Sequence, residues 1–96
     1  MSLDTKRAFR EDATARLENE ERYVIRLAEN IKRVRLDADM SIEDAALALG
    51  MTSIQLERTE TRANGLRVET LLRMSELYNK PIAALLPNMG KQSNRP

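Results

Sequence analysis

Two helix starts around a single glycine constrain this fold more than any other feature. In the stretch SIEDAALALGMTSIQLERTE, Ser41 is suited to cap one helix and Thr52 to cap a second. Each cap is followed three residues later by Asp44 or Gln55, which is the spacing of a capping box. Gly50 lies between the two, and glycine readily adopts the left-handed conformation that ends a helix. The stretch therefore predicts two helices packed across a turn of about three residues.

Composition limits both the core and the chemistry. The chain has 96 residues, of which 42% are hydrophobic and 3% aromatic, so it can build one modest, mainly aliphatic core. It contains no Cys and no His. Nucleophilic cysteine chemistry, general-base catalysis by histidine and the usual zinc sites are thereby excluded. We expect no enzyme activity, no catalytic residue, no metal site and no cofactor.

The apolar residues also bear on the location of the protein. No apolar run approaches the roughly 18 residues that a spanning helix needs, and the start, MSLDTKRAFRED, has no signal-peptide core. The lack of cysteine fits a reducing compartment. We expect a soluble, cytoplasmic protein with no membrane partner.

Apolar residues recur at helical spacing in the first part of the predicted core. Between about Glu21 and Ala38 they are separated by three- and four-residue steps, the period of an amphipathic helix. These residues are Val24, Leu27, Ala28, Ile31 and Val34.

Four shorter helices are predicted to complete the fold. Two follow from the caps, at about 42–49 and 53–61. A third begins near Val68 and ends at Asn79, and a short one follows Pro81, which suits the first turn of a helix. The core-facing residues of the helix after Val68 are Leu71, Leu72, Met74 and Leu77. Because no segment shows strand alternation, the predicted fold is all-α, a compact five-helix bundle.

Charge density sets the expected domain boundaries. Residues 1–22 carry five basic and six acidic groups around a thin apolar stripe, and are either a frayed arm or an extra helix for dimerisation or partner binding. We favour the arm, because few large apolar groups are present to offset the ordering entropy. The bundle spans 23–86, and 87–96 is expected to be a disordered tail. The stripe consists of Phe9, Ala13 and Leu17.

The chain from Leu27 to Leu86 resembles the XRE family, the phage Cro and repressor type of helix-turn-helix domain. The resemblance rests on IKRVR, on the two-helix unit that begins at Ser41, and on VETLLRMSELYNKPIAALL. It implies a lambda-repressor-like bundle whose third helix enters the DNA major groove, in a homodimer on a two-fold symmetric operator. It also implies a structural ion pair between Arg35 and Glu60, for which the alternative is two ordinary surface charges.

The same resemblance assigns the DNA contacts. Arg58 can bond guanine O6 and N7, Glu57 can accept from cytosine N4, and Ile54 can pack on a thymine methyl group. Alternatively, Glu57 and Arg58 form a solvated surface without a partner. The expected base-reading residues are Ser53, Ile54, Glu57 and Arg58, and the expected backbone contacts are Ser41, Thr52, Gln55, Arg62 and Arg67.

The charge of the chain does not decide between two classes of function. The net charge is +1, and residues 41–62 carry four acidic and two basic groups, a poor balance for a polyanion partner. The first hypothesis is a sequence-specific DNA-binding transcriptional regulator that reads the major groove with residues 53–61. The alternative is a protein-binding helix-turn-helix module, antitoxin-like or an antiactivator, that does not bind DNA itself.

Overall fold

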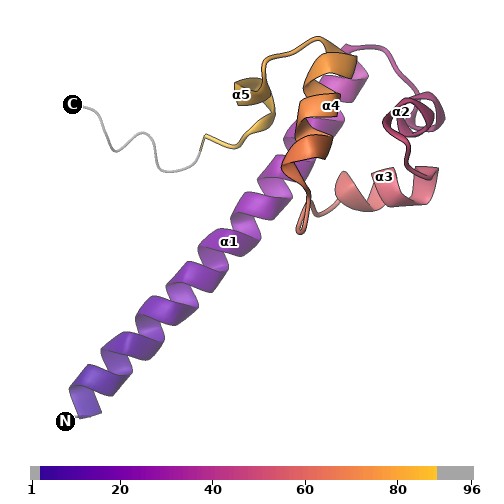
Figure 1. Cartoon of the computed structure of the whole chain (residues 1–96). Helices are drawn as coiled ribbons and strands as arrows, with labels where there is room; N and C mark the ends of the chain where they lie inside the picture. Colours follow the sequence, from indigo (N-terminus) through magenta and orange to yellow (C-terminus); the bar gives the residue numbers. More distant parts are fainter. Residues whose placement is uncertain (1–2, 89–96) are drawn as a thin grey trace, which may run out of the picture.

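Helix α1 (Leu3–Asp37) is the longest element of the structure, a computed structural model that describes the backbone of residues 3–88 and the side chains of residues 17–88. Its 35 residues span about 52 Å at 1.5 Å per residue. One end lies among the other helices and the other projects away from them (Figure 1). Of the two alternatives, an arm or an extra helix, the structure has a helix over residues 3–22 in place of the arm that we favoured, and this helix is continuous with the first helix of the bundle.

Four shorter helices complete the fold: α2 (Ile42–Leu49), α3 (Ser53–Thr59), α4 (Val68–Tyr78) and α5 (Ile82–Leu85). The predicted all-α, five-helix fold is confirmed, with no strand among residues 3–88. Helix α2 packs against α3 and α4, and α5 packs against α1 and α4 (Figure 1).

Some predicted boundaries differ from those observed. Helix α3 ends two residues earlier than expected, at Thr59, and Pro81 is the N-cap of α5, just before its first turn. Residues 89–96 of the predicted tail lie outside the described residues. None of the described helices has the length and apolarity required to cross a membrane.

The hydrophobic core gathers side chains from all five helices and from the loop after α3. Four large side chains are completely buried, which fixes the relative positions of α1, α3, α4 and α5. Leu72, which we predicted to face the core, is 52% exposed. Helix α4 instead buries Met74 and Tyr78, and a residue two positions before Met74 lies on the opposite side of a helix. The largest completely buried residues are Ile31, Leu56, Met74 and Leu85.

The turn between α2 and α3 has the predicted geometry. Gly50 has φ +72°, and its N–H donates to the carbonyls of Ala46 and Leu47. The Thr52 hydroxyl accepts from the Gln55 N–H at 3.0 Å, and the Gln55 side chain accepts from the Thr52 N–H at 2.9 Å. This is a complete capping box, and it fixes where α3 begins.

The capping box predicted for α2 forms only in part. The Ser41 hydroxyl accepts from the Asp44 N–H at 3.0 Å, so Ser41 caps the helix as expected. The structure shows no return bond from the Ser41 N–H to the Asp44 carboxylate. The side chain of Asp is one methylene group shorter than that of the Glu or Gln that usually closes the box, which accounts for the difference.

Two long-range hydrogen bonds connect α1 to other parts of the chain, one to the loop after α3 and one to α5. The Ala63 N–H donates to the Val24 carbonyl at 3.1 Å, which holds the loop after α3 against α1. The Asn30 amide donates to the Leu85 carbonyl at 3.2 Å and so joins α1 to α5. At the end of α4, Asn79 has φ +57° and takes the left-handed position expected for it. The bond between Ala63 and Val24 positions the end of α3 relative to α1.

Candidate functional site

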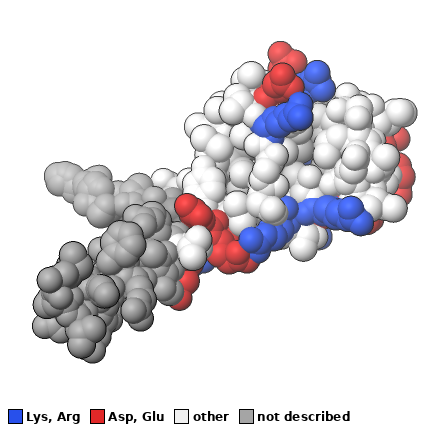
Figure 2. Space-filling model, turned by 60° about the horizontal axis from the view of Figure 1, so that its bottom comes forward, with Lys and Arg blue, Asp and Glu red and all other residues white. Residues whose placement is uncertain are grey.

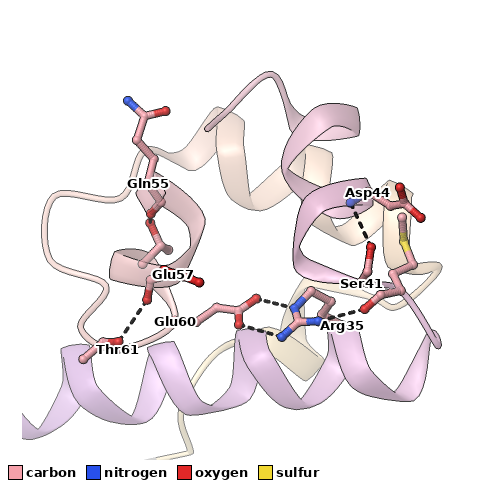
Figure 3. Close-up of polar contacts among 9 residues, drawn as sticks. Arg35, Ser41, Asp44, Gln55, Glu57, Glu60 and Thr61 are labelled. Atoms are coloured by element: carbon pink, nitrogen blue, oxygen red, sulfur yellow. Dashed lines mark hydrogen bonds and ion pairs between the residues drawn. The ribbon is translucent and has the colours of Figure 1, made fainter. Parts of the chain in front are cut away.

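A buried ion pair between α1 and the C-cap residue of α3 fixes the orientation of α3. The Arg35 Nε donates to Glu60 Oε2 at 2.7 Å, and its Nη2 donates to Glu60 Oε1 at 3.0 Å (Figure 3). The remaining Nη1 donates to the Met40 carbonyl at 2.7 Å. Arg35 is 7% exposed and Glu60 is 9% exposed. The hydrogen bond with Glu60 raises the pKa of Arg35, so the pair stays charged and links α1, the loop before α2, and the end of α3.

The side of α3 opposite the core forms an exposed surface. Leu56 points into the core, and at about 100° per residue the positions of Ile54, Glu57 and Arg58 point outward. The turn after α3 places Thr61 on the same side, where its hydroxyl donates to the Glu57 carbonyl at 2.9 Å (Figure 3). We call these four residues, Ile54, Glu57, Arg58 and Thr61, the α3 face. They line an open groove of about 460 Å³ together with Arg62 and Asn64.

The α3 face combines an exposed apolar side chain with two charged ones. Ile54 is 60% exposed and contributes the large apolar side chain. Among residues 17–88, no ion pair involves the Glu57 carboxylate or the Arg58 guanidinium. The face can therefore offer one apolar contact, one acceptor group and one donor group to another molecule.

The structure separates the predicted contact residues into two groups. Ile54, Glu57 and Arg58 lie together on the α3 face, whereas Ser53 is half-buried at the start of the helix. The polar side chains of Ser41, Thr52 and Gln55 accept hydrogen bonds as helix caps. These caps hold the helix ends, and their acceptor atoms already have partners.

The basic residues after α3 also have structural surroundings. Arg62 forms an ion pair with Glu21 of α1, and this hydrogen bond lowers the pKa of Glu21. Arg67 is the N-cap residue of α4 and lines a second groove, of about 530 Å³, with Arg58 and Arg73. The sequence did not single out Arg73, because its place in the same groove as Arg58 depends on how α3 lies relative to α4.

Charges of both signs are spread over the molecule. In the view of Figure 2, Lys and Arg side chains form a row along the lower edge of the described surface, and a smaller group at the top lies beside Asp and Glu. The net charge is only +1, from 16 basic and 15 acidic residues. The molecule as a whole therefore exerts little general attraction on a polyanion.

Comparison with known proteins gives one informative likeness. No protein-family model matches the chain, and no curated protein matches it. The chain is similar to a solved structure described as FeII HppE in complex with substrate, with a TM-score of 0.66 and 25% sequence identity. The likeness covers 74% of this chain and 40% of the HppE chain. The resemblance to the XRE family therefore stays a prediction.

This likeness contradicts the function predicted from the sequence. The matched protein is an FeII protein bound to its substrate, which points away from a sequence-specific DNA-binding transcriptional regulator. We accordingly correct that prediction. Because the chain spans less than half of the HppE chain, the activity of HppE is not transferred to it either.

The residues of this chain do not fit an FeII centre. Protein sites for non-haem FeII typically use two His and one carboxylate, and the 96 residues contain no His. Among the described residues, no three acidic side chains gather into a group that could hold a metal ion. We therefore derive no chemistry through iron here, and the α3 face remains the candidate site.

Proposed function

We propose that this chain is a non-catalytic protein-binding module that holds its partner on the α3 face. The proposal places the module in the cytoplasm, which the lack of cysteine favours. The lack of His and Cys supports the non-catalytic part, since the most common general base and the most common nucleophilic thiol are both missing.

The exposed Ile54 between two charged side chains is the observation that carries the proposal. Protein interfaces commonly have an apolar centre surrounded by polar and charged groups. Fully burying an isoleucine side chain contributes about 1.5–3 kcal/mol, and the 60% of Ile54 that is exposed is available for such burial. Glu57 and Arg58 beside it can then select the partner through charge complementarity.

The rigidity of α3 supports the same function. The capping box at Thr52 fixes the start of the helix, and the ion pair of Arg35 with Glu60 fixes its end. Leu56, completely buried, anchors the middle. A surface held in this way loses little conformational entropy on binding, so more of the contact energy appears as affinity.

Site-specific photo-cross-linking in cells tests the proposal. Ile54 is replaced by p-benzoylphenylalanine in the full chain, and Leu47 is replaced in the same way as the control. Leu47 is the matched position because it is 81% exposed on α2, outside the groove over the α3 face. We expect a protein adduct from position 54 and none above background from position 47. Equal labelling at both positions, or an adduct with nucleic acid alone, would overturn the proposal.

A further inference from the structure

The α3 face is complementary to a copy of itself. Ile54 and Thr61 are equally distant in sequence from the midpoint between Glu57 and Arg58. When two such helices lie antiparallel about that midpoint, each Glu57 lies opposite the Arg58 of the other copy, and each Ile54 lies opposite the other Thr61. A two-fold interface has this property, because one surface patch must match itself.

We propose that the partner of the α3 face is a second copy of this chain, with the two α3 helices antiparallel about a two-fold axis. This inference rests on the proposed function and names the occupant of the same surface. Two-fold symmetry forms the Glu57 to Arg58 ion pair twice. It also covers both Ile54 side chains, each with the methyl group of the opposite Thr61.

The electrostatic balance of the face permits close approach of two copies. Glu57 and Arg58 contribute one negative and one positive charge. Arg62, the other charged residue lining the groove, is already paired with Glu21. Two identical surfaces therefore carry no net charge toward each other, and like-charge repulsion does not oppose the contact.

The size of the face sets the expected strength of the dimer. Helix α3 has only seven residues, and four side chains form the face. A standard stable interface buries about 1,600 Å², with roughly 20–30 residues on each side, so this interface belongs to the weak, transient class. Dimerisation should therefore rise with protein concentration. It should fall with salt, because exposed charge pairs are screened over about 8–10 Å.

Charge reversal with exchange of partners provides the test. In the single variants Glu57→Arg and Arg58→Glu, each dimer would place like charges opposite each other at both symmetry-related contacts. We expect each single variant to raise the dimer dissociation constant by about tenfold or more in sedimentation equilibrium. An equimolar mixture of the two variants restores both opposite-charge contacts, so it should dimerise like the wild type. The double variant, which carries both changes, should also recover.

The controls keep the outcome independent of folding. Circular dichroism melting should be similar for all variants, because Glu57 and Arg58 are exposed. Leu47→Lys, a change on the exposed surface of α2, should leave dimerisation unchanged. Failure of the mixture and of the double variant to recover would overturn the two-fold pairing, as would a monomeric wild type at millimolar concentration. If position 54 still cross-links to a different protein, the proposed function survives, and without any adduct both proposals fail.

Discussion

Arg35 is the residue whose loss should damage the fold most directly. Arg35→Ala removes the charged partner of Glu60, a residue that is only 9% exposed in the intact protein. Removal of one member of a buried pair typically costs about 3–5 kcal/mol. We expect the melting temperature to fall by more than about 10 °C, since 1 kcal/mol shifts a domain of this size by about 4–8 °C.

An exposed arginine on the same helix provides the control for this prediction. Arg33 is exposed on α1, and within residues 17–88 its guanidinium donates only to the Asn30 side chain, at 2.8 Å. Arg33→Ala should therefore change the free energy of unfolding by less than about 0.5 kcal/mol. Equal melting temperatures for the Arg35 and Arg33 variants in differential scanning calorimetry would show that the buried pair contributes nothing to stability.

Tyr78 is a second residue with a distinct energetic signature. It is 3% exposed, and its hydroxyl has no hydrogen-bond partner in the described part of the chain. A buried polar group without a partner costs about 1–3 kcal/mol. We expect Tyr78→Phe, which removes only this hydroxyl, to raise the free energy of unfolding by about 1 kcal/mol in urea titrations. A loss of stability would mean that the hydroxyl does form a favourable contact.

The same residue predicts a pH dependence of stability. Burial and, to a smaller extent, the charge of Glu60 together raise the pKa of Tyr78 from 10.0 to about 12, against the opposing effect of Arg35. The folded state therefore holds the tyrosine proton more tightly than the unfolded state. The resulting stabilisation is complete below pH 10 and is lost as the pH rises toward 12. Tyr78→Phe should remove this part of the alkaline destabilisation, and identical curves for both proteins would contradict the assignment.

At the scale of elements, the turn between α2 and α3 depends on one backbone conformation. Gly50 has φ +72°, and a Cβ built there would meet no atom within 4 Å. The cost of Gly50→Ala is therefore conformational, about 1–2 kcal/mol, because alanine resists the left-handed region. Gly50→Asn should cost less, because asparagine tolerates that region. Thermal melts that rank the two variants in the opposite order would show that contacts, and not φ, control this position.

Several helix ends could be predicted because the residues that determine them act locally. Gly50, Thr52 and Asn79 determine where helices begin or end through bonds to residues only a few positions away. The start of α1 could not be predicted in this way. Residues 3–20 have too thin an apolar stripe to form an isolated helix, but the buried part of α1 provides a nucleus from which the helix can extend.

The candidate site could be predicted only in part. The resemblance to the XRE family grouped Ile54, Glu57 and Arg58, and these three residues line one groove because one short helix carries all of them. The ion pair of Arg62 with Glu21 joins residues 41 positions apart, so no local pattern reveals it. The same exposed side chains suit more than one kind of partner, which is why the predicted function needed correction.

At the scale of the whole molecule, α1 gives the chain an extended shape. The Cα radius of gyration is 17.0 Å, and the principal extents are 57 × 35 × 19 Å. A compact domain of 96 residues would have a radius of gyration of about 12.5 Å. Small-angle X-ray scattering at low concentration should give a value closer to 17 Å. The Ile54→Lys variant is the control that removes self-association, and a value near 12–13 Å for it would show that α1 does not project.

The continuity of α1 has a mechanical consequence. One unbroken rod connects the buried Ile31 to the tip at Leu3, so the tip cannot swing without turning a side chain that sits in the core. A force applied at Leu3 is therefore transmitted along α1 to the core around Ile31. Unwinding of α1 from its N-terminal end, one turn at a time, would separate the movement of Leu3 from that of the core.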